Sequence, residues 1–134
     1  MRILLDTHIL LWALENNPKL PERAYQLISD ETNELFFSTA SVWEITIKHL
    51  AKPDKMLISG EDLAHLCEQA GYNALPILNQ HVFQLNTLKR PENAPPHHDP
   101  FDRMMIAQAK AEKIIFMTHD ALLPDYSENC ILYV

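Results

Sequence analysis

The sequence lacks most of the features that mark secreted, fibrous and membrane proteins. Its 134 residues include only two cysteines, Cys67 and Cys130, whose separation fits neither a disulfide framework nor a zinc-binding spacing. No apolar run approaches the roughly 20 residues that a membrane-spanning helix needs. The first apolar run is interrupted by Asp6, which excludes a signal-peptide core. These absences predict a reducing, cytoplasmic setting and no membrane partner.

Positive charge is also scarce. The 11 lysines and arginines are outnumbered by 18 acidic residues, and the formal net charge is −7. Modules that hold nucleic acid by bulk electrostatics are usually basic, so this class is disfavoured. A nuclease whose acids surround divalent cations stays open, because bound cations reverse the local charge.

The hydrophobic pattern predicts one domain over residues 1–134, built from alternating strands and helices. Apolar runs predict strands over residues 2–5, 35–37, 73–78, 114–118 and 131–134. Helical spacing and capping signals predict helices over residues 8–15, 21–31, 39–51, 60–70, 80–88 and 100–112. Several of the strands are wholly apolar, which predicts a three-layer α/β/α fold around a central, mostly parallel sheet.

Two acids directly follow predicted strands. Asp6 ends the first apolar run, and Asp120 follows the strand 114–118 in the sequence Thr118-His119-Asp120. Each has an ordinary alternative, because Asp is a favoured helix cap and turn residue. In parallel sheets, however, ligands bind beyond the carboxyl ends of the strands, which is where both acids are expected.

Glu44 can be interpreted in two ways. Ser41 and Glu44 have the spacing of a capping box, in which both residues serve only to begin a helix. If Ser38 or Thr39 begins the helix instead, Glu44 lies in the second turn, near the sheet edge.

Asp102 lies in the stretch Asp99-Pro100-Phe101-Asp102. Asp99 is predicted to cap a helix whose first residue is Pro100. Asp102 then shares an inward face with Ile106 and Ala109. A buried carboxylate is costly without a partner, and a metal ion is the most effective one. We therefore predict that Asp102 is a ligand, and that Asp99 is a cap with at most a secondary role at the site.

Together, these positions predict four carboxylates at one edge of one sheet: Asp6, Glu44, Asp102 and Asp120. Carboxylates this close repel one another unless a divalent cation lies between them. Hard oxygen ligands suit Mg²⁺, with Mn²⁺ as an alternative. Such ions activate water and stabilise the charge that develops during attack on a phosphodiester.

The whole chain resembles PIN domains, and specifically VapC-type toxins of type II bacterial toxin–antitoxin systems. The resemblance rests on four segments, namely Leu4-Leu5-Asp6-Thr7-His8, Ser41-Val42-Trp43-Glu44-Ile45, His98-Asp99-Pro100-Phe101-Asp102-Arg103-Met104 and Thr118-His119-Asp120. It implies a PIN fold, Mg²⁺-dependent cleavage of RNA, and the same four acids as metal-binding catalytic residues. It also implies that Thr118 helps to hold the site, that the chain forms a homodimer, and that a cognate antitoxin neutralises it.

Several neighbouring residues keep two interpretations. Lys48 either pairs with Glu44 along one helix or contacts RNA phosphate, and Arg103 is equally open. His97 and His98 either contact RNA or a metal, or are solvated loop residues. Trp12 and Trp43 are expected to pack in the core or at a dimer interface.

The sequence disfavours two other functions and leaves two open. A haloacid-dehalogenase-type phosphatase needs a second acid two residues after Asp6, where this chain has His8. A receiver-like domain needs an early pair of acids, which is absent. A PIN nuclease that is not a toxin, and a catalytically silent PIN domain that binds RNA or protein, both remain open.

Overall fold

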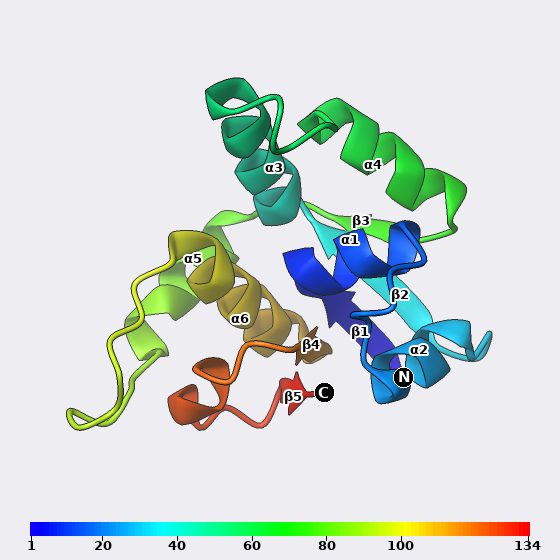
Figure 1. The fold of residues 1–134 in the computed structure, drawn as a ribbon. Coiled ribbons are helices and arrows are strands. Elements are labelled where there is room, and N and C mark those ends of the chain that lie inside the picture. Colours follow the sequence, from blue (N-terminus) through cyan, green and yellow to red (C-terminus); the bar gives the residue numbers. More distant parts are fainter.

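The computed structural model describes residues 1–134 as alternating strands and helices around one sheet (Figure 1). The strands are β1 (Arg2–Leu5), β2 (Glu34–Ser38), β3 (Asn73–Leu75), β4 (Ile115–Thr118) and β5 (Ile131–Tyr133). The α-helices are α1 (Thr7–Leu14), α2 (Glu22–Ser29), α3 (Thr39–Ala51), α4 (Gly60–Gln69), α5 (Asn79–Gln84) and α6 (Pro100–Glu112). Two short 3₁₀ helices, η1 (Leu85–Thr87) and η2 (Leu123–Tyr126), complete the chain. No helix is both long and apolar enough to cross a membrane.

The five strands form a single parallel sheet in the order β3-β2-β1-β4-β5. The prediction of an α/β fold with a mostly parallel sheet is therefore confirmed, and every pair of neighbouring strands is parallel. In the register of β1 and β4, Leu5 lies opposite Met117. The carboxyl ends of these central strands are thus level, and the residues that follow them meet at one edge.

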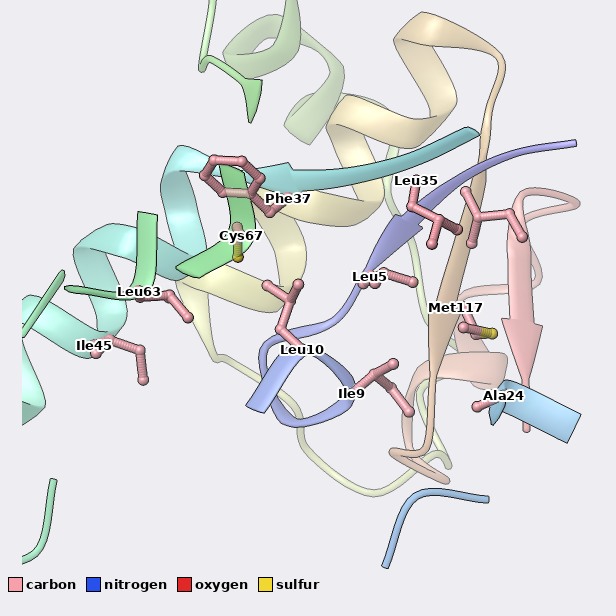
Figure 2. Packing of buried hydrophobic residues seen from close by; sticks show 11 residues of the cluster. Leu5, Ile9, Leu10, Ala24, Leu35, Phe37, Ile45, Leu63, Cys67 and Met117 are labelled. Carbon is pink, nitrogen blue, oxygen red and sulfur yellow. The ribbon is translucent and has the colours of Figure 1, made fainter. Parts of the chain in front are cut away.

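Alternation along the strands divides the core between the two faces of the sheet. Ile3 and Leu5 face α1, α2 and α4, where they pack in a cluster with Leu10 and Leu63 (Figure 2). Leu4 faces the other side, where the cluster includes Met105, Ile106 and other residues of α6. The two faces carry separate hydrophobic layers, as a three-layer fold requires.

One predicted strand ends early, and one predicted helix is divided in two. The strand predicted over residues 73–78 ends at Leu75, because Pro76 cannot donate a backbone hydrogen bond to the sheet. The carbonyl oxygens of Leu75 and Pro76 instead accept hydrogen bonds from the side chain of Gln108. The helix predicted over residues 80–88 divides into α5 and η1, and within this stretch the Thr87 hydroxyl donates to the carbonyl of Gln84.

Helix α3 begins directly at the carboxyl end of β2. Ser38 caps it by accepting a hydrogen bond from Ala40 N, so the capping-box interpretation of Ser41 and Glu44 is wrong. The prediction that Glu44 lies in the second turn is confirmed. Helix α3 then packs against α4, and the two helices lie together beyond the edge of the sheet (Figure 1).

Candidate active site

Asp6 follows β1 and is held by hydrogen bonds to both of its carboxylate oxygens. Its Oδ1 accepts from the backbone N–H of Thr7 at 2.7 Å, and its Oδ2 accepts from the Thr118 hydroxyl at 2.6 Å. The residue is only 5% exposed. Burial raises the pKa of Asp6 to about 6, although both hydrogen bonds oppose this rise. Asp6 therefore caps α1 and also presents a fixed carboxylate at the sheet edge.

Glu44 reaches the same edge from α3. Its Oε1 accepts a hydrogen bond from the Thr7 hydroxyl at 2.8 Å, and the Ser41 hydroxyl lies 2.8 Å from that of Thr7. Glu44 is 6% exposed, and its Oε2 is paired with Lys48 Nζ at 2.7 Å. The structure thus contains the helix pair that was one of the two interpretations of Lys48. Thr7 connects the first turn of α1 to the acid on α3.

Asp102 lies in the first turn of α6, as the Asp99-Pro100 signal predicts. Asp99 caps this helix by accepting hydrogen bonds from the backbone N–H groups of Phe101 and Asp102, so its predicted capping role is confirmed. The Asp102 side chain is 15% exposed, and its Oδ2 lies 3.1 Å from Nε2 of His97. Its other oxygen makes no hydrogen bond within the protein.

Asp120 follows β4 after one intervening residue. Its Oδ1 accepts a hydrogen bond from Leu122 N at 2.9 Å, and its own backbone N–H donates to the Thr118 hydroxyl at 3.0 Å. Thr118 therefore connects two of the predicted acids, because the same hydroxyl donates to Asp6. One oxygen of Asp120 is left without a hydrogen-bond partner in the protein.

The side chains that could bind a metal lie closest together where α6 begins and just after β4 ends. One ligand atom from each of His97, Asp102 and Asp120 lies within 4.8 Å of the other two. Asp6 and Glu44 are outside this group of three, but their charges still influence Asp102. Burial raises the pKa of Asp102 to about 8, and the carboxylates of Asp6, Asp99, Glu44 and Asp120 add to the rise.

These residues fit a divalent cation. A carboxylate that is mostly buried and surrounded by other acids has no cationic partner of its own, since Lys48 is paired with Glu44. Asp102 and Asp120 each keep an oxygen that accepts no hydrogen bond from the protein. The carboxylate oxygens of this site suit Mg²⁺ or Mn²⁺.

Two residues at this site were not among the predicted site residues. For His97, the sequence left open a contact to RNA or a metal and a solvated loop position; its side chain is only 5% exposed and lies against Asp102, so the solvated alternative is wrong. Tyr126, in η2, is buried, and its hydroxyl lies 2.7 Å from Nδ1 of His97. Arg103 also donates to the Tyr126 hydroxyl, at 3.2 Å. The only sequence signal for His97 is its place just before the cap of α6.

Four rings from α1, β5 and the segment after β4 form a row. The ring of Trp12 lies 5.7 Å from that of His8 and 5.8 Å from that of His119. The ring of His119 is in turn stacked on Tyr133, at 5.6 Å and an angle of 5°. We call these four residues the aromatic row. Trp12 also packs against the core, as predicted, whereas the ring of Trp43 is exposed and contacts Phe101.

Comparison with known proteins gives a consistent result. The family model described as "PIN domain" matches residues 3–129. No curated protein matches the sequence.

Three solved structures have the same fold, and each is described as a VapBC protein. The VapBC2 structure from Rickettsia felis, bound to a promoter DNA fragment, has a TM-score of 0.70 at 15% identity, covering 99% of this chain and 98% of that chain. VapBC-1 from nontypeable Haemophilus influenzae has a TM-score of 0.64 at 20% identity, covering 99% and 98%. DNA-bound VapBC from Salmonella typhimurium has a TM-score of 0.65 at 15% identity, covering 100% and 97%.

The family match spans nearly the whole chain, so the protein belongs to the PIN domain family.

Proposed function

We propose that this PIN domain is a divalent-metal-dependent endoribonuclease and the toxin of a toxin–antitoxin pair, with residues 1–134 forming one domain. The observation that carries the proposal is the environment of Asp102. Burial raises the pKa of this carboxyl group to about 8, and the carboxylates of Asp6, Asp99, Glu44 and Asp120 add to the rise. A bound cation would allow it to ionise at neutral pH, and the acids then serve a common purpose.

The residues of the site divide into metal ligands and residues that hold those ligands in place. Asp6, Glu44, Asp102 and Asp120 hold the metal, which when bound supplies an activated water and stabilises charge at the phosphorus. The Thr118 hydroxyl fixes Asp6 and the backbone of Asp120. Asp99 remains the cap of α6 and keeps the first turn of that helix in place. These contacts hold the ligands in position before substrate arrives.

The aromatic row supports a nucleic-acid substrate. Exposed rings stack on unpaired bases, and such stacking does not depend strongly on sequence. His8 lies close enough to Asp6 for its charge to lower the pKa of that acid, and His119 directly precedes Asp120. A base resting on the row would therefore bring its phosphate toward the acids. Because the chain carries a net charge of −7, we expect few phosphate contacts and a shallow dependence of cleavage on salt. Loss of cleavage over a modest rise in salt would contradict that expectation.

Exposed apolar side chains support protein partners. One set lies on α3 and the loop after it, and consists of Ile47, Leu50 and Leu57. A second set lies on or just before α5, and consists of Leu78, Val82 and Phe83. We propose that a cognate antitoxin and a second copy of the chain cover these surfaces. A monomeric sedimentation mass at micromolar concentration would exclude the homodimer.

The experiment that tests the nuclease is cleavage of a mixed pool of RNA by purified protein. Parallel reactions contain Mg²⁺, Mn²⁺ or EDTA, and a matched pool of single-stranded DNA tests the preference for RNA. Asp6→Asn removes one charge without changing side-chain volume, and Asp54→Asn makes the same change at an exposed position in the loop after α3. We expect metal-dependent cleavage of RNA by the wild type and by Asp54→Asn, and at least a hundredfold loss in Asp6→Asn.

Binding of RNA without cleavage would favour a catalytically silent PIN domain. If the folded wild type, free of antitoxin, binds RNA but cleaves none in either metal, the chain acts by binding. Cleavage that persists in Asp6→Asn would instead indicate a contaminating nuclease. Co-purification of a small protein encoded beside the gene, with cleavage suppressed in the complex, is the result expected of a toxin.

A further inference from the structure

His97 is buried in a position that its sequence context does not explain. It ends the proline-containing loop between η1 and α6, yet its side chain is 5% exposed, whereas the neighbouring His98 is exposed. Burial lowers the pKa of His97, opposed by the charges of Asp120 and Asp99. A ring placed there needs a partner for each nitrogen, because unpaired buried polar atoms are costly. Its Nε2 lies against Asp102, and its Nδ1 lies against the hydroxyl of Tyr126.

The surroundings of Tyr126 hold this ring rigidly. Tyr126 meets the His97 ring edge-on, with centroids 5.5 Å apart at an angle of 88°. Its hydroxyl also accepts a hydrogen bond from Arg103. Arg90 lies over the Tyr126 ring at 5.0 Å and donates to the carbonyl oxygens of Pro95 and Leu122, which ties the loop to η2. The orientation of His97 is thus fixed directly by Tyr126 and Asp102, and Tyr126 is held in turn by the two arginines.

Histidines that bind metals are commonly oriented by a hydrogen bond of this kind. In such sites one ring nitrogen faces the ion, and the other donates a hydrogen bond to an oxygen that fixes the tautomer. The Tyr126 hydroxyl has two acceptor positions, so it can accept from both Arg103 and Nδ1 of His97. Nε2 is then left with its lone pair directed toward Asp102 and Asp120.

The distances are close to those of ligands around a single ion. Metal–ligand bonds of about 2.1 Å place two ligand atoms of one octahedral ion about 3 to 4 Å apart. Nε2 of His97 lies 3.1 Å from Asp102 Oδ2, and ligand atoms of His97, Asp102 and Asp120 all lie within 4.8 Å of one another. Small side-chain movements would bring all three to one cation.

We propose that His97 supplies a nitrogen ligand to the divalent ion held by Asp102 and Asp120, and that this ligand makes the site prefer Mn²⁺ to Mg²⁺. The inference rests on the proposed metal-dependent nuclease and deepens its metal site. Mg²⁺ takes oxygen ligands and retains its waters, whereas imidazole nitrogen suits transition ions. A hydrogen bond from Nε2 to Asp102, with His97 acting only as a positioning residue, is the competing arrangement.

The test is pulsed electron paramagnetic resonance of Mn²⁺ bound at less than one equivalent to metal-free protein. A coordinated imidazole produces electron spin-echo modulation from its ¹⁴N nucleus, and labelling of histidine with ¹⁵N changes that modulation. We expect the signal in the wild type and in His98→Gln, and its loss in His97→Gln. Calorimetric titrations with each ion should show the Mn²⁺ preference over Mg²⁺ falling by at least about tenfold in His97→Gln alone.

The outcomes separate the two proposals. Mn²⁺ that binds the wild type without nitrogen modulation overturns the role of His97 and leaves the metal-dependent nuclease standing. A wild type that binds neither Mn²⁺ nor Mg²⁺ at millimolar concentration overturns both. The wild-type spectrum does not depend on any variant, so a His97→Gln protein that fails to fold does not remove the test. In that case His119→Gln and His8→Gln, which remove the other histidines beside the acids, must retain the modulation.

Discussion

Replacement of Asp102 by Asn should stabilise the metal-free protein, and increasingly so as the pH rises. The pKa of Asp102 is raised from 3.8 to about 8 in the folded chain. The folded state therefore holds this proton more tightly than the unfolded state. Between about pH 4 and pH 8, unfolding releases the proton, so the stability of the wild type falls as the pH increases through this window. Asn cannot ionise, so the variant is free of this loss.

The size of the effect follows from the pKa. At about 1.4 kcal/mol for each pKa unit, the rise corresponds to roughly 6 kcal/mol against the ionised form. Water that enters the metal-free site, and partial protonation of neighbouring acids, will reduce the measured value. We expect Asp102→Asn to exceed the wild type by about 1–3 kcal/mol at pH 9 and to match it near pH 4. Asp54→Asn, at an exposed position, should show no such trend.

Urea denaturation followed by circular dichroism, in EDTA at several pH values from 4 to 9, measures this difference directly. Excess Mn²⁺ should reverse the order, because an ion present at a hundred times its dissociation constant adds about 2.7 kcal/mol to the protein that binds it. If the free energy of unfolding depended equally on pH in Asp102→Asn and in the wild type, the buried carboxyl could not be the source of the pH-dependent loss of stability.

Three further substitutions test contacts around the site. Thr118→Val removes the hydroxyl that lowers the pKa of Asp6, so the carboxyl holds its proton to higher pH and cleavage should fall more at pH 6 than at pH 8; a uniform loss across the pH profile would contradict this. Gly60→Ala places a Cβ 2.7 Å from the carbonyl oxygen of Val42, so the variant should lose about 1–3 kcal/mol in urea titrations, and an unchanged midpoint would show that α4 can shift freely. Ser38→Ala removes the cap of α3 and the bond to Gln108, which should cost about 1–2 kcal/mol by the same measurement; a neutral result would mean that water replaces both contacts.

Local signals explain how much of this fold and site could be predicted. The Asp99-Pro100 pair marks the start of α6 through backbone chemistry alone, so Asp102 could be assigned to its first turn. Asp6 could be assigned to the sheet edge because an apolar run ends directly before it. The strand predicted over residues 73–78 ends at Leu75 because Pro76 cannot donate to the sheet, and the distant side chain of Gln108 donates hydrogen bonds to the carbonyls of Leu75 and Pro76.

His97 could not be assigned for a related reason. Its burial depends on Tyr126, which lies 29 residues further along the chain, and on arginines that hold the loop in place. No periodicity or capping signal encodes such contacts, since they arise only when η2 packs beside α6. A histidine in a proline-containing loop therefore looks like a solvated residue until the tertiary structure is known.

Glu44 is paired with Lys48, but the other acids of the site have no lysine or arginine partner. The hydrogen bonds that Thr7 and Thr118 donate to Glu44 and Asp6 fix the carboxylates without neutralising them. The helix dipole at the start of α6 adds at most about 1 kcal/mol in favour of Asp102, far less than the cost implied by its pKa. The fold therefore maintains repulsion at one edge of the sheet, and the well-packed layers on both faces of that sheet supply the stability that makes this possible. An ion that relieves the repulsion should consequently tighten the site and raise the unfolding temperature together, and a metal that restored activity without stabilising the chain would separate the two effects.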